Sequence, residues 1–221
     1  MTPSREASAQ RPPAAHDGAL AGFPRYRLRG TTAVHRAHLA ANSPWWFSSI
    51  GGRFDLPEPR GTCYLATTPL AAVRERLGPV LAARRTVPAT ALDGVVVSTL
   101  RCSVPQGAAS VRLADLRVAA AADFGVTREL ESMTPYDVPR AWADAFDRAG
   151  LDGVRYGPRF SPGPASALAV FGACGVDERR ALDPSPTPAA AVAGVPTSVQ
   201  LPRRRDLTVI APPGARKRPR R

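Results

Sequence analysis

The sequence predicts one α+β domain with a tail at each end. Two segments carry helix signals and several short apolar runs carry strand signals, without the regular strand–helix alternation of a doubly wound sheet. A chain of 221 residues, 44% of them hydrophobic, is long and apolar enough to bury a sizeable core.

Both expected helices are bounded by residues typical of helix ends. The first is expected over 69–77, with Thr68 as its cap, proline at its first position and Gly78 after its end. The second is expected over about 139–149, where apolar residues recur at helical spacing and Gly150 follows. The strand candidates are the short apolar runs 63–66, 94–100, 153–156 and 167–171.

Composition divides the chain into three parts. Residues 1–22 are rich in Ala, Pro and Ser, and we expect them to be disordered. Residues 23–176 carry the strand and helix patterns and form the expected folded domain. Residues 177–221 are expected to be a Pro/Ala-rich linker followed by an Arg-rich tail.

Positive charge is concentrated in that tail. The formal net charge is +12, and residues 201–221 alone hold 8 basic residues and 1 acidic residue. A basic terminus is usually a solvated one, so contact of the tail with nucleic acid or an acidic partner is the minority interpretation.

Several classes of protein are excluded at this stage. No apolar run approaches the roughly 20 residues that cross a bilayer, and the first residues lack the apolar core of a signal peptide. Cys63, Cys102 and Cys174 are far apart, which argues against a disulfide scaffold or a cysteine zinc site. The chain has three histidines, to which we assign no role. We therefore expect a cytoplasmic protein with no membrane segment and no metal.

Residues with binding chemistry gather in the segment 34–78. Arg36, Arg53, Tyr64 and Glu75 follow one another there. Guanidinium groups bind pyrophosphate oxygens in bidentate fashion, and a phenol ring offers a face for stacking. A carboxylate can hydrogen-bond ribose hydroxyls and stabilise positive charge that develops at a sugar carbon. The set suits a phosphorylated aromatic ligand.

This order and spacing resembles the RES domain, a family named for Arg, Glu and Ser. The resemblance covers most of residues 23–176 and continues through Leu113-Ala114-Asp115-Leu116, Phe124-Gly125-Val126-Thr127, Gly150-Leu151-Asp152-Gly153-Val154-Arg155-Tyr156 and Ala169-Val170-Phe171-Gly172. It implies the split mixed sheet of mono-ADP-ribosyltransferases, with NAD as the substrate and no resident cofactor. RES proteins degrade NAD or transfer ADP-ribose to a protein, typically as toxins restrained by a helix-turn-helix antitoxin, here one encoded separately.

By position, the resemblance assigns roles to four residues. Arg36 and Arg53 match the two family arginines and would clamp the phosphates. Tyr64 matches the pocket tyrosine and would pack against the nicotinamide or its ribose. Glu75 matches the name-giving glutamate and would stabilise an oxocarbenium-like transition state. Glu75, Arg53 and Tyr64 are thus the expected catalytic residues.

The chain departs from the family at the serine. Pro158 stands at the family serine position, and proline offers neither a hydroxyl nor a backbone N–H. Either the nearby Ser161 moves inward and binds substrate instead, or a subfamily works without the serine, or activity is impaired. The residues leave these three alternatives open.

Each site residue also has a simpler interpretation. Glu75 lies opposite the apolar side of its helix, which fits either solvent or a cleft. Arg53 could form a surface ion pair with Asp55, and Tyr64 could be a core residue with its hydroxyl at the edge. Arg36 could belong to a surface patch. The ordered set, with its matching second half, favours a site.

The aromatic run Trp45-Trp46-Phe47 has two interpretations. Such residues more often pack in a core than contact a ligand, and a wall of a neighbouring pocket is the alternative.

The sequence therefore predicts an enzyme that cleaves the nicotinamide–ribose bond of NAD, with water, phosphate or a protein as acceptor. The alternative is a RES-like binding module that has lost catalysis, which Pro158 and the Arg-rich tail favour. A third interpretation, an accidental resemblance, predicts a structure in which Arg53, Tyr64 and Glu75 border no common cleft.

Overall fold

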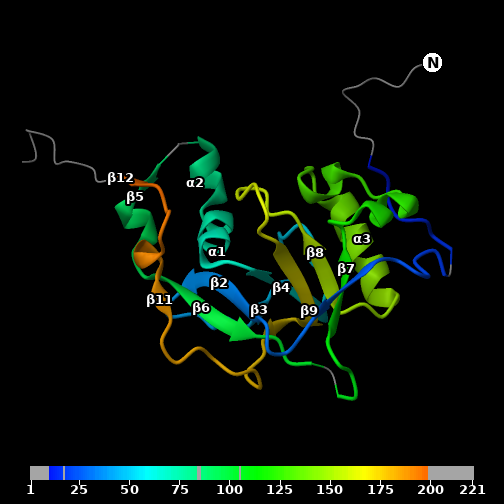
Figure 1. Ribbon diagram of the computed structural model, residues 1–221, viewed down its shortest axis with the longest axis horizontal. Helices are drawn as coiled ribbons and strands as arrows, with labels where there is room; N and C mark the ends of the chain where they lie inside the picture. Colours follow the sequence, from blue (N-terminus) through cyan, green and yellow to red (C-terminus); the bar gives the residue numbers. More distant parts are fainter. Residues whose placement is uncertain (1–9, 17, 84–85, 105, 199–221) are drawn as a thin grey trace, which may run out of the picture.

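The computed structural model describes residues 10–16, 18–83, 86–104 and 106–198. Eight strands form one mixed sheet in the order β1-β7-β8-β9-β4-β2-β6-β11 (Figure 1). Their bounds are β1 Arg25–Leu28, β2 Ala33–Leu39, β4 Arg60–Ala66, β6 Val95–Arg101, β7 Val111–Asp115, β8 Gly153–Tyr156, β9 Ala167–Ala173 and β11 Thr187–Pro188. Two small sheets pair β3 (Trp46–Phe47) with β10 (Gly175–Val176) and β5 (Val87–Pro88) with β12 (Thr197–Ser198).

Few helices accompany this sheet. The α-helices are α1 Pro69–Arg76, α2 Gly78–Ala83 and α3 Asp137–Arg148. Short 3-10 helices are η1 Ala89–Leu92, η2 Ala119–Phe124, η3 Arg128–Glu131 and η4 Ala189–Ala191. The α+β class predicted from the sequence is confirmed, and the four predicted strand runs fall on β4, β6, β8 and β9.

The large sheet is split between β2 and β4. Each of these strands pairs along its whole length with its outer neighbour, β2 with β6 and β4 with β9. Between themselves, β2 and β4 share a single registered pair, His35 with Ala66. Away from that pair the two strands diverge, so the sheet opens beside α1. This is the split sheet that the sequence predicts.

The first helix forms as the sequence predicts, but its continuation differs. The Thr68 hydroxyl accepts a hydrogen bond from the Ala71 backbone N at 3.2 Å, as a cap should. Helix α1 ends at Arg76 with Leu77 as its cap, so Gly78 follows its end as predicted, and the same glycine opens a second helix, α2, that the sequence did not predict. A Cβ at Gly78 would collide with the ring of Phe160, so close packing explains the glycine better than termination does.

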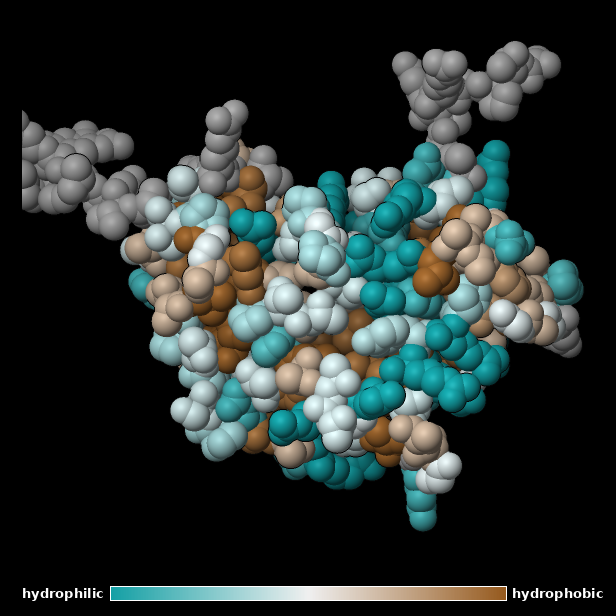
Figure 2. Space-filling view, viewed as in Figure 1, coloured by the Kyte–Doolittle hydropathy of each residue, from teal (hydrophilic) through white to brown (hydrophobic). Residues whose placement is uncertain are grey.

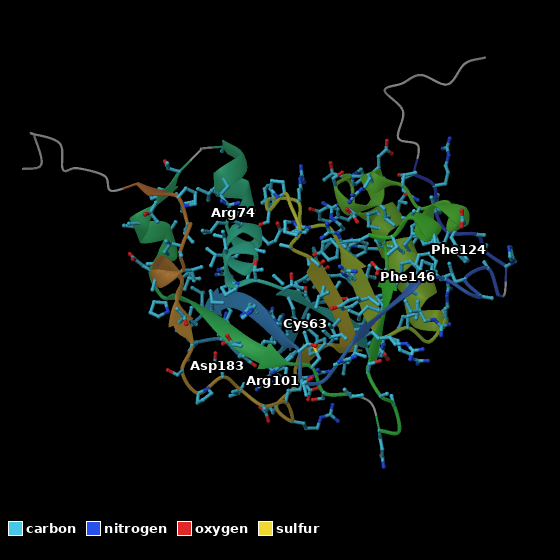
Figure 3. All side chains as sticks on the ribbon, in the orientation of Figure 1. Cys63, Arg74, Arg101, Phe124, Phe146 and Asp183 are labelled. Carbon is cyan, nitrogen blue, oxygen red and sulfur yellow. The ribbon has the colours of Figure 1, made fainter. Side chains whose placement is uncertain are left out.

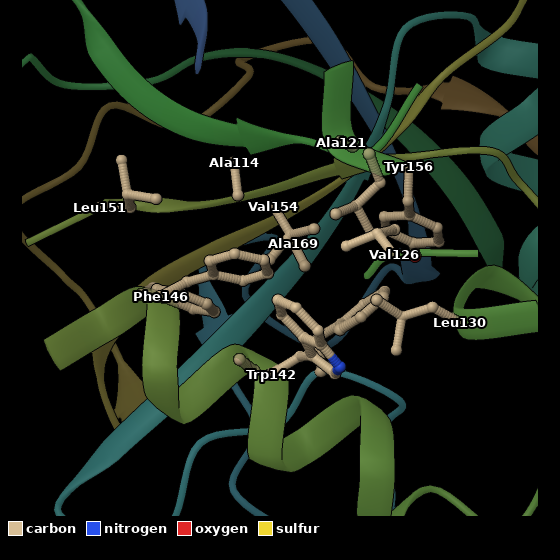
Figure 4. Close-up of a cluster of buried hydrophobic side chains, with 14 of the residues drawn as sticks. Ala114, Ala121, Val126, Leu130, Trp142, Phe146, Leu151, Val154, Tyr156 and Ala169 are labelled. Carbon is tan, nitrogen blue, oxygen red and sulfur yellow. The ribbon is translucent and has the colours of Figure 1, made fainter. Parts of the chain in front are cut away.

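Helix α3 covers one end of the sheet with an aromatic face. Trp142 and Phe146 are buried, their ring centroids lie 5.5 Å apart, and both point toward β8 and β9 (Figure 4). Gly150 follows the helix with a φ of 74°, a conformation that favours glycine. The helix thus spans nearly the expected range and fixes the half of the sheet that carries Tyr156.

The described part of the N-terminal segment contacts the domain instead of being disordered. The Gln10 side chain is buried and accepts a hydrogen bond from the Thr127 backbone N at 2.7 Å. The indole N–H of Trp142 donates to the carbonyl of Arg11 at 2.8 Å. A segment without periodicity can still be ordered through such polar contacts, which no sequence pattern signals. Residues 1–9 lie outside the described residues.

Part of the expected linker also belongs to the fold. β11 adds to the edge of the sheet beside β6, and Ala189 is fully buried. Asp183, labelled in Figure 3, accepts a hydrogen bond from the Thr99 backbone N of β6 at 2.7 Å. Figure 2 shows apolar side chains between α1 and this returning segment, and hydrophilic ones over the half that carries α3. The Arg-rich tail, 201–221, lies outside the described residues.

Within the described ranges, no helix is long and apolar enough to cross a bilayer. The same residues form no group of three or more His, Cys, Asp or Glu side chains placed to hold a metal ion.

Candidate active site

A cleft of about 370 Å³ opens where β2 and β4 diverge. It lies at the lower end of the range of about 300–1,000 Å³ that is typical of ligand pockets. Its walls come from β2, β4, α1, β8 and the loop before β4, and Figure 3 labels Cys63 on β4 and Arg74 on α1. The lining residues include four that the sequence singles out: Arg36, Arg53, Tyr64 and Glu75.

Glu75 faces this cleft from α1. Ala72 and Val73 on the same helix are buried against the sheet, which leaves the Glu75 carboxylate beside the cleft instead of in the core. Its Oε1 accepts a hydrogen bond from the Phe160 backbone N at 2.7 Å, so the loop before β9 fixes its orientation. Burial raises the pKa of the Glu75 carboxyl, although that hydrogen bond and the positive charge of Arg53 oppose the shift. Of the two interpretations left open for Glu75, the structure selects the cleft.

Arg53 is a buried cation in the same cleft. Its side chain is 8% exposed, and its Nη1 donates to the Met133 carbonyl at 2.6 Å. The guanidinium lies over the ring of Tyr136, 4.7 Å from the ring centroid. Among the described residues no carboxylate lies within salt-bridge distance of it, so the ion pair with Asp55, the alternative interpretation of this arginine, does not form. Burial lowers the pKa of Arg53, yet an arginine stays charged at neutral pH.

Tyr64 fixes the loop that carries Arg53. Its hydroxyl donates to Asp55 Oδ1 at 2.7 Å and accepts from the Phe54 backbone N at 2.9 Å. The other oxygen of Asp55 accepts from the Gly52 backbone N at 2.7 Å. A Cβ at Gly52 would collide with both the Asp55 carboxylate and the Tyr64 hydroxyl, so this tight loop requires glycine. Burial raises the pKa of Tyr64 well above its ordinary value, and the ring remains a neutral wall of the cleft.

Arg36 lies on β2 and anchors the segment before β3. Its Nη1 donates to the carbonyls of Pro44 at 2.7 Å and Trp46 at 2.8 Å, and it lies 2.9 Å from Cys63 Sγ. Within the described part of the chain, its other guanidinium nitrogens donate to no protein acceptor. The surface-patch interpretation is therefore wrong, and Arg36 combines an anchoring role with a place in the cleft wall.

Ser161 is not among the residues that line this cleft. It is buried beside a separate hollow of about 280 Å³, together with Pro158, and its hydroxyl has no hydrogen-bond partner among the residues that the structure describes. The structure thus does not bring Ser161 together with the four other predicted residues. The loop before β9 instead contributes the Phe160 backbone N–H, which donates a hydrogen bond to the Glu75 carboxylate.

Sequence reasoning missed four further lining residues with polar or charged side chains: His35, Arg76, Tyr136 and Tyr156. Tyr156 ends the strand motif that was compared with the RES family, so its position could have been inferred. Tyr136 comes from a loop with no pattern, and only folding brings its ring to Arg53. His35 and His38 lie on a strand, three residues apart, so they point to opposite faces. His35 meets the cleft, whereas His38 is buried with its Nε2 2.8 Å from Ser98 Oγ.

A split mixed sheet with two arginines, a tyrosine and a glutamate around one cleft is what a RES domain is expected to present. The sequence model of the RES domain matches residues 27–191, most of the chain. The protein therefore belongs to the RES domain family.

A solved structure shares this fold. The chain is similar to a chain in the crystal structure of the M. tuberculosis MbcT-MbcA toxin-antitoxin complex, with 16% sequence identity and a TM-score of 0.59. The match covers 80% of this chain and 96% of that chain. At this identity the likeness shows the fold alone. A search of curated proteins found no match.

Proposed function

We propose that this RES domain protein cleaves the nicotinamide–ribose bond of NAD and acts as a toxin-type, NAD-depleting enzyme of the cytoplasm. The observation that carries the proposal is the cleft itself, where the buried Arg53, which has no salt bridge among the described residues, and the half-buried Glu75 face the same space among tyrosine rings. A buried cation that no neighbouring carboxylate neutralises favours an anionic ligand, and a pyrophosphate supplies one. The aromatic walls suit a flat base.

The proposed chemistry needs little from the protein besides positioning and charge. Arg53 and the free nitrogens of Arg36 bind the pyrophosphate, while Tyr64 packs against the nicotinamide or its ribose. Nicotinamide leaves as a neutral molecule with the bonding electron pair, so positive charge shifts from the pyridinium ring to the ribose carbon. The Glu75 carboxylate holds the ribose hydroxyls and stabilises that charge. Water, phosphate or a protein side chain then forms the new bond.

NAD consumption by the purified protein tests this proposal, with and without phosphate and with Glu75→Ala as control. Turnover that the substitution abolishes supports a NAD-cleaving enzyme, and dependence on phosphate identifies the acceptor. Absence of turnover in both conditions contradicts cleavage with water or phosphate, and labelled NAD then tests transfer to protein.

One observation favours the second candidate, a binding module that has lost catalysis. Pro158 replaces the family serine, and Ser161 does not reach the cleft. Suppose that the wild type does not cleave NAD. If the missing serine is the reason, Pro158→Ser should restore NAD cleavage. Salt-sensitive nucleic-acid binding that disappears when residues 201–221 are deleted would favour the module.

A separately encoded antitoxin is part of the proposal. The similar chain comes from a complex named as a toxin–antitoxin pair. Co-purification of this protein with the product of a neighbouring reading frame, and loss of its NAD cleavage in that complex, would support such a partner.

A further inference from the structure

A hollow of about 280 Å³, separate from the cleft, lies beside the loop 157–163, which joins β8 to β9. Its walls come from this loop, from η3 and from Arg117, which follows β7. The hollow and the cleft have no lining residue in common. We call this space the loop hollow.

The loop 157–163 contacts a different element on each of two sides. Toward the cleft, the Phe160 backbone N–H donates to the Glu75 carboxylate at 2.7 Å. Toward η3, a Cβ at Gly157 would collide with Oε2 of Glu131, so glycine lets that carboxylate approach the loop backbone. A ligand in the loop hollow therefore touches the loop that orients Glu75 without entering the cleft.

Three arginines line the loop hollow against one carboxylate. They are Arg117, Arg128 and Arg159, and the carboxylate is Glu131. Nη1 of Arg128 pairs with Glu131 Oε2 at 3.1 Å, and Arg117 donates to backbone carbonyls of the segment 163–165. Arg159 forms no salt bridge within the described ranges. The loop hollow thus keeps a net positive charge, which favours an anion such as a phosphate group.

Two buried polar atoms at the loop hollow have no hydrogen-bond partner in the described part of the chain. One is the hydroxyl of Ser161, a residue that is 5% exposed, and the other is Oε1 of Glu131, which is 7% exposed. A buried polar atom without a partner lowers stability unless a ligand satisfies it. The carboxylate oxygen accepts hydrogen bonds, so the ligand must carry donors as well as negative charge.

We propose that the loop hollow binds a small phosphorylated polyhydroxy compound. Its phosphate lies against Arg128 and Arg159, and its hydroxyl groups donate to Glu131 Oε1 and form a hydrogen bond with Ser161. The volume of about 280 Å³ is just below the range of about 300–1,000 Å³ typical of ligand pockets, which suits a ligand of this modest size. The inference goes beyond the proposed function, because it concerns binding outside the cleft.

Titration calorimetry of the full chain with ribose 5-phosphate tests the inference, with ribose and inorganic phosphate as comparison ligands. Arg159→Gln is expected to weaken ribose 5-phosphate binding by about tenfold or more, because a charge-assisted hydrogen bond is lost. Ser161→Ala should weaken it roughly three- to tenfold, since a neutral hydroxyl contributes less. Arg27→Gln, at an exposed arginine of β1 that lines neither the cleft nor the loop hollow, is the matched control.

The comparison ligands test the two halves of the assignment. Ribose lacks the charge that the arginines favour, and inorganic phosphate lacks the sugar hydroxyls, so both should bind more weakly than ribose 5-phosphate. No binding of ribose 5-phosphate by the wild type, or equal affinity for ribose 5-phosphate and inorganic phosphate, would overturn the inference.

A variant of the cleft tests where the ligand sits. Arg53→Gln should leave the affinity for ribose 5-phosphate unchanged, because Arg53 lines the cleft and not the loop hollow. Binding that is lost in Arg53→Gln and kept in Ser161→Ala would place the ligand in the cleft and overturn the inference. Neither result depends on NAD cleavage, so failure of this inference and failure of the proposed function are distinguishable.

Two further measurements examine the loop itself. Ser161→Ala removes a buried hydroxyl without a partner, so the ligand-free variant should unfold at the temperature of the wild type or higher, and ribose 5-phosphate should stabilise it less. Hydrogen exchange of the backbone amides in 157–163 should slow when the wild type binds ribose 5-phosphate. A lower unfolding temperature for ligand-free Ser161→Ala, or exchange that the ligand leaves unchanged, would contradict the inference.

Discussion

Glu75 and Arg53 face the same cleft without forming an ion pair. Each is instead held by a backbone group, Glu75 by the Phe160 N–H and Arg53 by the Met133 carbonyl. Direct pairing would neutralise both charges and fill the space between them. Their separation keeps a carboxylate and a guanidinium available to different parts of a ligand, and burying Arg53 fully and Glu75 in part lowers the stability of the fold.

This cost predicts a stabilising substitution at residue 75. Because burial raises the pKa of Glu75, the folded protein holds this proton more tightly than the unfolded chain does. The resulting stability is present below the ordinary carboxyl pKa of about 4.3 and is lost as pH rises through the raised pKa. Glu75→Gln has no charge to bury, and its Oε1 can still accept the Phe160 N–H.

We therefore expect Glu75→Gln to unfold at the same temperature as the wild type or higher at pH 7, with the difference shrinking as pH falls. Thermal unfolding across pH checks this, with the exposed Glu178→Gln as control. A lower unfolding temperature for Glu75→Gln at pH 7 would contradict the account.

The site residues differ in how far the sequence predicts them. Arg36, Arg53, Tyr64 and Glu75 were found because they keep a family order, and the structure brings them to one cleft. Tyr136 could not be found this way, because its role depends on a loop that folding places over Arg53. Ser161 was chosen for its hydroxyl and its proximity in sequence, which do not determine where a side chain points.

At the level of elements, the junction of α1 and α2 packs against the loop before β9. Gly78 leaves room for the Phe160 ring, and the Phe160 backbone holds Glu75. Gly78→Ala should displace the ring and shift that N–H, lowering nicotinamide release by about tenfold or more.

Removal of the Phe160 ring tests whether Gly78 acts on Glu75 through Phe160. Phe160→Ala in the Gly78→Ala protein removes the collision and keeps the backbone N–H, so the double variant should recover activity, measured as nicotinamide release. A double variant no more active than Gly78→Ala would show that the glycine acts in another way.

Helices and strands with strong local sequence signals were predicted well. Strands that form only because they pair with a strand distant in sequence were not. Thr68 and Pro69 mark the start of α1 in the sequence, and four apolar runs mark strands. β11 has two residues in a Pro/Ala-rich segment, and its strand character comes from pairing with β6. Pairing of this kind leaves no periodicity to detect.

On the scale of the whole molecule, the segment after residue 176 closes the domain over β6 and α1. Ala189 is fully buried there, and the Trp45 indole N–H donates to the Ala181 carbonyl at 2.9 Å. A chain ending at residue 176 loses these contacts and exposes the edge of β6.

We expect this shortened chain to unfold at a temperature lower by about 5 °C or more than a chain ending at residue 198. Calorimetry on the two proteins measures the difference. Equal unfolding temperatures would show that residues 177–198 contact the domain without stabilising it.

The most direct test of the central claim is nicotinamide release from NAD by the wild type and Glu75→Gln, measured side by side at a temperature at which both proteins are folded. The account predicts release by the wild type and a rate at least about 100-fold lower for the variant, because the carboxylate that stabilises the ribosyl cation is gone. Full activity in Glu75→Gln, or no release by the wild type, would contradict it.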